Sequence, residues 1–272
     1  MPELPEVENI VKQLQEKAVG LVLSHVLIKN ESVLGTDKKF FESKLPKKSV
    51  QKVSRRGKYI QFSLDHETSL WFHLGMTGQL LWSDDETRLG RHVHLIVCFL
   101  NLTEKLVFRD IRRFGEVFIT NGSLMFYPEG LRCLGPEPFD LSAQDFSQLL
   151  KRRTGRIKSL LLNQRIIAGI GNIYADESLF RSGIHPKKIP SRLKHEKIEN
   201  LRHSICDVLK EAIELGGSSI DDYLHTDGSK GFFQKFHRVY GREGLECINC
   251  KTVIKRIKLA GRSSFFCPQC QK

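Results

Sequence analysis

The chain has 272 residues, of which 40% are hydrophobic and 27% charged, a composition typical of a folded protein and not of a disordered polyelectrolyte. Its 43 Lys and Arg residues outnumber 31 Asp and Glu residues, which gives a formal net charge of +12. The densest apolar run, Leu95–Leu100, is far shorter than the roughly 18 residues of a membrane span. The positive charge favours a polyanionic partner, most simply nucleic acid, although scattered lysines on a basic enzyme would give the same sum.

The first part of the chain is predicted to be mostly β-structure with one helix packed on it. After Pro5, apolar residues recur at helical spacing as far as Ala18, and Gly20 ends the pattern. From residue 21 to residue 120 the pattern shortens, and turn residues separate the segments. The predicted strands are Leu21–Ile28, Lys58–Leu64, Ser69–Phe72, His92–Phe99, Lys105–Phe108 and Glu116–Ile119.

The second part is predicted to be helical, so the fold class is α+β. Leu134–Pro138 contains one Gly and two Pro and is the expected linker. Beyond it the apolar period changes to 3.6, and a Gly- and Asp-containing loop and a Cys-rich β tail follow. The predicted helices are Ala143–Arg152, Ile157–Gln164, Asn172–Ser182 and Glu196–Leu215.

Four of the seven cysteines form two Cys-x2-Cys pairs separated by sixteen residues, Cys247 with Cys250 and Cys267 with Cys270. Each pair makes a tight knuckle that directs two sulfurs at one point, and the segment between them can form a β-hairpin. This spacing predicts one structural Zn²⁺ per chain with four thiolate ligands; two disulfides or a redox pair are the alternatives. Residues 238–272 also carry eight Lys or Arg and two Glu, a charge that suits a phosphate backbone, although zinc ribbons also bind proteins.

The other cysteines, Cys98, Cys133 and Cys206, make the total odd. The N-terminus is acidic and lacks the apolar region of a secretory signal. Together these features predict a reducing compartment, the cytoplasm.

An N-terminal secondary amine is the first candidate for chemistry. Removal of Met1 would expose the amine of Pro2. An α-amino group titrates near 7.7–8.0, so much more of it is neutral at physiological pH than of a lysine. Its condensation with an aldehyde gives an iminium ion, an electron sink for β-elimination. Taken alone, however, a proline here is more simply a stiff start to the chain.

Several motifs occur in the order found in one enzyme family and span nearly the whole chain. The chain opens on Pro2–Glu8, and the finger carries Gly261 and Arg262. The other motifs are Arg55–Tyr59, His73–Gly78, Arg112–Gly115, Leu134–Pro138, Gly169–Tyr174, Asp227–Phe233 and Val239–Arg242. The chain thereby resembles the formamidopyrimidine-DNA glycosylases of bacteria.

The resemblance implies a β-sandwich-like domain with an amphipathic N-terminal helix, a helical helix-two-turn-helix domain and a β-hairpin zinc finger. The implied limits are 1–134 for the catalytic domain, 135–140 for the linker, 141–237 for the helical domain with a lesion-binding loop, and 238–272 for the finger. It further implies a monomer that binds double-stranded DNA and does not associate with a membrane. Such an enzyme excises oxidised purines, 8-oxoguanine and formamidopyrimidines, and then cuts the strand by β,δ-elimination.

The resemblance also assigns four catalytic residues. Pro2 is the implied nucleophile on C1′, and Glu3 is the implied donor of a proton to the sugar ring oxygen. Lys58 is the implied general acid of β-elimination, and Arg262 is the implied residue of δ-elimination. Because arginine stays protonated, we expect Arg262 to anchor the flanking phosphate. Without the resemblance, Glu3 would be a first-turn helix acid and Lys58 a solvated lysine at a strand edge.

Excision requires the damaged base outside the stack, and the resulting hole must be filled. Met76, Arg112 and Phe114 match the side chains that the family inserts there, with core packing as the alternative for Met76 and Phe114. The loop Ser218–Phe233 resembles a lid over the flipped base. The remaining implied DNA contacts are His73, His92, Arg153, Asn172, Tyr240 and Arg256.

One motif departs from the family pattern. Arg91-His92-Val93-His94 stands where Lys-His-Asp-His is frequent, so the phosphate contact of His92 is less secure. A metal at the His-x-His pair lacks a third ligand nearby, and alternating strand residues are the preferred interpretation. The competing functions are an endonuclease VIII-like enzyme for oxidised pyrimidines, which Leu4 and Gly228–Phe233 disfavour, and a non-catalytic binder of damaged DNA, which the intact catalytic residues disfavour.

Overall fold

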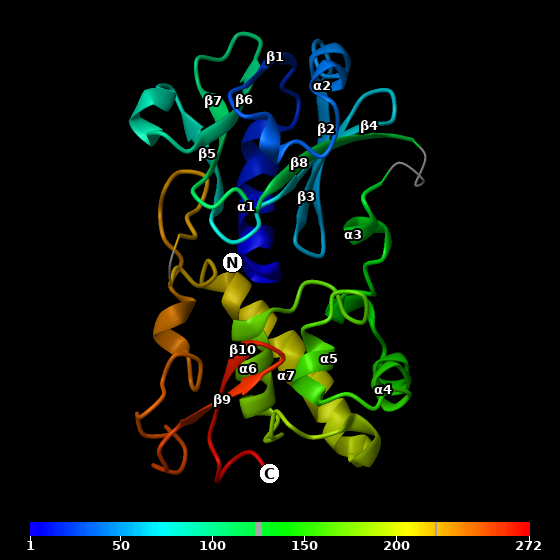
Figure 1. Cartoon of the computed structure of the whole chain (residues 1–272), viewed down its shortest axis with the longest axis vertical. Helices are drawn as coiled ribbons and strands as arrows, with labels where there is room; N and C mark the ends of the chain where they lie inside the picture. Colours follow the sequence, from blue (N-terminus) through cyan, green and yellow to red (C-terminus); the bar gives the residue numbers. More distant parts are fainter. Residues whose placement is uncertain (123–126, 221) are drawn as a thin grey trace. The chain divides into compact units, whose positions relative to one another are not determined.

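The computed structural model describes residues 1–122, 127–220 and 222–272, so that Asp221 of the predicted lid lies outside the described residues. Internal contacts divide the chain into two units (Figure 1). The first unit is Met1–Arg132 with Gly216–Phe232, and the second is Cys133–Leu215 with Phe233–Lys272. The segment 216–232 therefore belongs with the first unit, although it follows the helices of the second along the chain.

The first unit is built on two four-stranded antiparallel sheets. The first sheet has the strand order β1 (Leu23–Ile28), β6 (Val93–Phe99), β7 (Lys105–Asp110) and β5 (Gly78–Ser83). The second has the order β2 (Val50–Arg56), β3 (Tyr59–Leu64), β4 (Thr68–His73) and β8 (Glu116–Asn121). This arrangement confirms the predicted β-sandwich-like domain.

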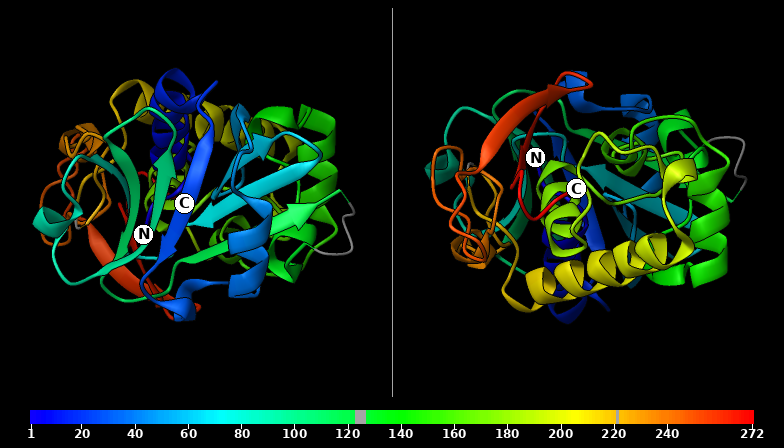
Figure 2. Two further views of the ribbon diagram at one scale, coloured as in Figure 1. Left: turned by 90° about the horizontal axis from the view of Figure 1, so that it is seen from above. Right: turned by 90° about the horizontal axis from the view of Figure 1, so that it is seen from below.

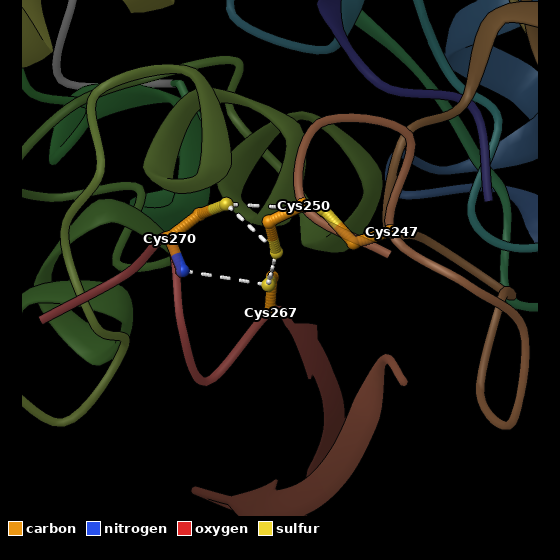
Figure 3. Close-up of side chains that lie close together, drawn as sticks. All are labelled: Cys247, Cys250, Cys267 and Cys270. Atoms are coloured by element: carbon orange, nitrogen blue, oxygen red, sulfur yellow. Dashed lines mark hydrogen bonds between the residues drawn. The ribbon is translucent and has the colours of Figure 1, made fainter. Parts of the chain in front are cut away.

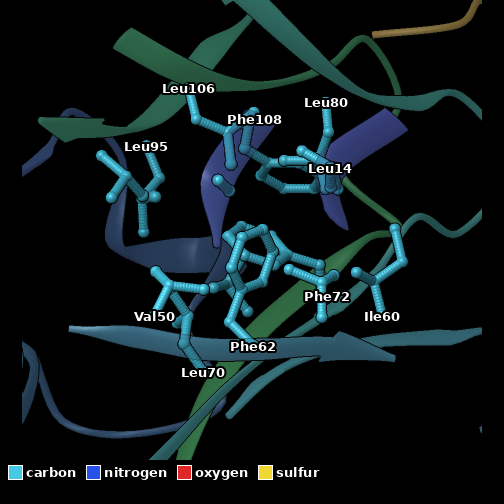
Figure 4. Packing of buried hydrophobic residues seen from close by; sticks show 14 of the residues in the cluster. Leu14, Val50, Ile60, Phe62, Leu70, Phe72, Leu80, Leu95, Leu106 and Phe108 are labelled. Atoms are coloured by element: carbon cyan, nitrogen blue, oxygen red, sulfur yellow. The ribbon is translucent and has the colours of Figure 1, made fainter. Parts of the chain in front are cut away.

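The core of this unit lies between the two sheets and the apolar face of α1 (Leu4–Ala18). Figure 4 shows side chains of the first sheet, among them Leu80 and Phe108, facing those of the second, among them Phe62 and Phe72. The helix contributes the residues whose spacing predicted it, Val7, Ile10, Val11, Leu14 and Ala18, all buried. Burying each such large side chain stabilises the fold by about 1.5–3 kcal/mol.

The predicted set lacks the strands β2 and β5 and the helices α2 (Lys38–Lys44) and α3 (Glu129–Arg132) of this unit, besides its short 3-10 turns. Only Val50 and Val53 of β2 are buried, and α2 buries only Phe41, so neither shows a clear apolar period. Lys58 was predicted on a strand, and that placement is wrong. It lies in the turn between β2 and β3, where Gly57 adopts φ 57° and the chain reverses between the paired residues Arg56 and Tyr59.

The second unit holds the predicted helices almost at their predicted limits: α4 (Ala143–Lys151), α5 (Ile157–Leu161), α6 (Asn172–Arg181) and α7 (His195–Glu214). Helix α7 packs against α6 through its apolar face, and the two lie side by side in Figures 1 and 2. Two antiparallel strands, β9 (Lys255–Leu259) and β10 (Arg262–Phe266), form the predicted hairpin between the cysteine pairs. No described helix combines the length and apolarity needed to cross a membrane.

The remaining short helical segments join these elements. They are α3 (Glu129–Arg132), η1 (Glu31–Val33), η2 (Glu86–Leu89), η4 (Pro138–Asp140), η5 (Pro190–Arg192) and η6 (Phe233–Phe236).

Candidate functional site

The residues at the start of α1 are buried, and two of them carry acidic side chains. Pro2 is buried, Glu3 is 3% exposed, and Glu6 is 1% exposed. Glu3 is the N-cap of the helix, and its backbone N–H donates to Glu6 Oε2 at 2.8 Å. Glu3 and Glu6 thus form a capping box, in which each side chain accepts from the backbone N–H of the other. Glu3 therefore also caps the helix N-terminus, the task that the alternative interpretation gave to it.

Glu6 also joins the helix to the segment that follows Leu215. Its Oε1 accepts a hydrogen bond from the Ser218 N–H at 2.8 Å. A Cβ atom on Gly217 would lie 2.8 Å from that same oxygen, and Gly217 has φ 80°, so only glycine fits this approach. The Tyr223 hydroxyl donates to the Glu6 carbonyl at 3.3 Å. The segment is thus attached beside the residues Pro2 and Glu3.

The same segment is anchored further along α1 by Gln13. Its Oε1 accepts from the Thr226 N–H at 2.8 Å and from the Thr226 hydroxyl at 2.9 Å. The Thr226 carbonyl accepts from the Trp82 N–H of β5 at 2.9 Å. Residues 227–230, by contrast, are exposed. The chain therefore presents an anchored segment with an exposed tip.

The Lys58 turn is connected to α1 by Arg55. Arg55 Nε donates to Glu8 Oε2 at 2.8 Å, and its guanidinium also donates to the Gly57 carbonyl at 3.0 Å. Lys58 itself is only 6% exposed. The structure thus buries the lysine that the sequence alone would leave in solvent.

His73, at the end of β4, lies close to this turn. It is paired in register with Tyr59, and the two rings lie 4.6 Å apart between centroids. Burial and the positive charge of Lys58 lower the pKa of His73 to about 4. The imidazole is therefore neutral at physiological pH, with one nitrogen that can donate a hydrogen bond and one that can accept. His92 lies just before β6, half-buried.

Met76, Arg112 and Phe114 lie on two exposed loops of the first unit. Met76 is 39% exposed and Phe114 is 55% exposed, so core packing is excluded for both. The Arg112 guanidinium lies over the Phe114 ring, 4.8 Å from its centroid. An apolar wedge and a cation are thereby held together in solvent.

In the second unit, buried side chains of α5 and α6 hold the hairpin of the zinc finger in place. Asp176 is 1% exposed and pairs with the fully buried Lys158 of α5 at 2.7 Å. The Asp176 carboxylate also accepts from the Phe265 N–H at 3.0 Å, and Lys158 donates to the Ser263 carbonyl at 2.9 Å. Burial raises the pKa of Asp176 to about 7, against the effect of Lys158. Both ions are bound to β10, so their role is to position the hairpin.

Glu177, the next residue of α6, holds the chain before the finger. Its carboxylate accepts from the backbone N–H groups of Arg238, Val239 and Tyr240, at 2.8 to 3.1 Å. The Tyr240 ring packs edge-on against Phe265 of β10, 5.2 Å between centroids. Tyr240 is thereby fixed relative to the hairpin.

The remaining side chains of this unit that are predicted to contact DNA differ in their surroundings. Arg262 is exposed where β10 begins, after a turn in which Ala260 and Gly261 have positive φ. Arg256 is exposed on β9 and pairs with Glu243 at 2.8 Å. Half-buried Arg153 lines a surface hollow along α4. Half-buried Asn172 opens α6, and its amide oxygen has no hydrogen-bond partner among the described residues.

Figure 3 shows the four finger cysteines converging on one point above the hairpin. The sulfurs of Cys250 and Cys267 lie 3.4 Å apart and those of Cys247 and Cys270 lie 3.8 Å apart. Disulfides, at about 2.05 Å, are therefore excluded, whereas a tetrahedral Zn–S site requires sulfurs separated by about 3.8 Å. The set binds one structural Zn²⁺ with no open coordination position. Among the described residues these cysteines are the one group of three or more His, Cys, Asp or Glu side chains whose ligand atoms lie close enough together to share a metal ion.

Sequence reasoning assigned no part to several residues that organise these groups. Glu6 could have been found from the Glu3-x-x-Glu6 capping spacing, a local signal. Arg55, Gln13, Asp176 and Glu177 act through partners far away in the sequence, and nothing in the local pattern marks them.

Three sequence-family models match the chain. They are the formamidopyrimidine-DNA glycosylase N-terminal domain over residues 1–117, the formamidopyrimidine-DNA glycosylase H2TH domain over 134–223, and a zinc finger found in FPG and IleRS over 244–272. A formamidopyrimidine-DNA glycosylase of Solibacter usitatus is 45% identical over 273 residues, which cover 100% of both chains.

Solved structures agree with these matches. A Lactococcus lactis FPG mutant bound to Fapy-dG containing DNA is 35% identical, with a TM-score of 0.92 and 100% of each chain covered. MutM in complex with carbocyclic 8-oxo-G containing DNA is also 35% identical, with a TM-score of 0.91 and 100% of each chain covered.

Proposed function

The chain belongs to the formamidopyrimidine-DNA glycosylase family, and from this premise we propose that it excises oxidised purines from duplex DNA and then cleaves the strand at the abasic site. The substrate class follows from relatives captured with Fapy-dG and 8-oxo-G DNA. The observation on this chain that carries the proposal is the burial of Pro2 next to Glu3 at the start of α1.

Excision begins once Met1 is removed and the amine of Pro2 is free. The nitrogen attacks C1′ of the damaged nucleotide, a C1′–N bond forms, and the bond from C1′ to the base breaks with its electron pair leaving on the base. Glu3 donates a proton to the sugar ring oxygen as the ring opens, and the proton that the amine loses passes to the departing base. The product is an iminium ion between Pro2 and the opened sugar. Glu6 holds the backbone of Glu3 for this step.

Strand cleavage uses the iminium ion as an electron sink. Loss of a C2′ proton breaks the C3′–O bond, and a second elimination breaks the C5′–O bond. Lys58 protonates the leaving phosphate in the first elimination. The permanent charge of Arg262 anchors the flanking phosphate for the second.

The DNA is held bent, with the damaged base outside the stack. Met76, Arg112 and Phe114 fill the void, and Arg112 contacts the orphaned cytosine. Their exposure on two loops supports this assignment. The other contacts follow the backbone: His73 as a neutral imidazole, Asn172 with the N-terminus of α6, and His92, Arg153, Tyr240 and Arg256.

The decisive experiment is borohydride trapping on a duplex that contains 8-oxoguanine opposite cytosine. Correctly processed protein should form a covalent adduct, and Pro2→Gly should abolish it. Absence of an adduct from protein without Met1 would refute covalent catalysis and favour a non-catalytic binder. Preference for thymine glycol over 8-oxoguanine would instead indicate the endonuclease VIII branch.

We further propose that the enzyme acts as a monomer in the bacterial cytoplasm, on the chromosome. Its functional domains are 1–134, 141–237 and 238–272, joined by the linker 135–140. The elution volume in size-exclusion chromatography, with and without DNA, tests the monomeric state.

A further inference from the structure

One buried carboxylate connects the two loops that carry Met76, Arg112 and Phe114. Met76 lies in the turn between β4 and β5, and the other two lie between β7 and β8. Asp110, the last residue of β7, is 0% exposed. A buried carboxylate without partners would cost several kcal/mol, so its hydrogen bonds show what it organises.

The carboxylate of Asp110 accepts hydrogen bonds from both loops: Oδ2 binds only the loop between β7 and β8, and Oδ1 binds that loop and the turn between β4 and β5. Oδ2 accepts from the Gly115 N–H at 2.8 Å. Oδ1 accepts from the Arg112 N–H at 3.2 Å and from the Thr77 hydroxyl. The Thr77 oxygen itself accepts from the Arg112 N–H at 3.1 Å. The residues next to Met76 and Phe114, and Arg112 itself, are thus bound to one side chain.

Direct backbone contact and an unusual backbone conformation also constrain the two loops that carry Met76, Arg112 and Phe114. A Cβ atom on Gly75 would lie 2.5 Å from the Phe114 carbonyl carbon, so the turn and the loop are in direct backbone contact. Between the two hydrogen bonds to Asp110, Arg113 has φ 56°, a conformation that non-glycine residues rarely adopt. Asp110 is itself held, because its carbonyl lies 2.6 Å from His94 Nε2.

We propose that Asp110 is the positioning residue that sets Met76, Arg112 and Phe114 in one fixed arrangement, and that it thereby determines discrimination of the base opposite the lesion. The inference rests on the proposed function, in which these side chains enter the void. Arg112 reads the orphaned base from over the Phe114 ring. A shift of either loop would move the guanidinium away from cytosine while leaving the start of α1 unchanged.

Asp110→Asn tests this at nearly constant volume. An amide offers one acceptor oxygen, and its NH₂ group must face either Gly115 N–H or Arg112 N–H, so the loop between β7 and β8 loses at least one of its hydrogen bonds to residue 110. Single-turnover excision of 8-oxoguanine opposite cytosine should fall by about 10- to 100-fold, and the preference for cytosine over adenine opposite the lesion should approach one. Trapping on a single-stranded abasic oligonucleotide, which has no opposite base, should change by less than about twofold.

Two variants of Thr77 serve as matched controls. Thr77→Ser keeps the hydroxyl and should behave as the wild type, whereas Thr77→Val removes it and should show a smaller loss with the same change of preference. Thr77→Val also carries the test if Asp110→Asn does not fold. Folded Asp110→Asn that keeps its opposite-base preference, or that loses single-stranded trapping in parallel, would overturn the inference. Wild-type protein that traps neither substrate would refute the proposed function instead.

Discussion

Arg55 and Glu8 form an ion pair that joins α1 to the turn containing Lys58. The Nε–Oε2 distance is 2.8 Å, and the same guanidinium donates to the Gly57 carbonyl at 3.0 Å. The Arg55 side chain is 9% exposed and that of Glu8 is 28% exposed, so water screens the pair only in part. The pair links the helix that begins beside Pro2 and Glu3 to Lys58, and it lies within the proposed active site.

We expect Glu8→Gln to loosen this link. The neutral amide leaves the Arg55 charge without its counterion near Lys58, so the turn loses a charge-assisted hydrogen bond. Strand cleavage of a preformed abasic site should fall by about 3- to 10-fold. The free energy of unfolding, measured in urea, should fall by about 1 kcal/mol or less. Glu104→Gln removes the exposed pair with Lys17 and is the matched control, for which cleavage should not change. Equal losses from both variants would contradict the linking role.

We expect removal of zinc to disable DNA cleavage through the hairpin. The four sulfurs hold the two ends of the segment that contains β9 and β10, and Arg262 lies on it. Cys250→Ser should lower bound zinc from one equivalent to below stoichiometry, with loss of duplex cleavage and a lower melting temperature. Cys133→Ser, outside the finger and half-buried, should retain zinc and activity. Metal-free protein that is folded and fully active would disprove the zinc assignment.

The features that the sequence predicted well are local. The apolar period of α1 and of α4 to α7 marks each helix within a residue or two, except the end of α5, and two Cys-x2-Cys pairs define the finger. The exposure of Met76 and Phe114 excluded the core-packing alternative for both, whereas their insertion into DNA stays a prediction.

The features that escaped prediction depend on contacts between distant parts of the chain. Strand β2 is polar on one face, and only its pairing with β3 identifies it. Lys58 lies in a turn that Arg55 connects to α1, and this contact between distant parts of the chain accompanies its burial. No local sequence pattern identifies Asp110 as the hydrogen-bond partner of Thr77. Side-chain burial of this kind is a tertiary property, which periodicity cannot report.

We expect acid to destabilise the protein between pH 6.5 and pH 4 through two buried histidines. Burial lowers the pKa of His237 to about 4, and burial with Lys58 lowers that of His73 to about 4. An unfolded histidine titrates near 6.5, so in this window the unfolded chain binds more protons than the folded chain. The stabilisation is complete above pH 6.5 and is lost as the pH falls towards 4, by at most about 1.4 kcal/mol per pH unit for each histidine.

Urea unfolding of wild type and His237→Gln at several values of pH measures this effect. The variant should reduce the slope of unfolding free energy against pH by up to one proton, whereas replacing the exposed His203 by Gln should leave the slope unchanged. Identical slopes for the wild type and His237→Gln would show that His237 does not carry the linkage.

We expect affinity for DNA to fall steeply with salt and the finger arginines to contribute unequally. Each phosphate contact adds about 0.9 to the slope of log affinity against log salt. No described acidic side chain forms an ion pair with Arg262, whereas Arg256 pairs with Glu243 at 2.8 Å and must exchange that partner for a phosphate. Arg262→Ala should therefore lower the slope by about 0.9, and Arg256→Ala by less. Titration of a duplex containing a stable abasic analogue measures both, with the exposed Lys39→Ala on α2 as the control. Glu243→Gln should strengthen binding and steepen the slope, and weaker binding in that variant would show that Glu243 orients Arg256 rather than competing for it.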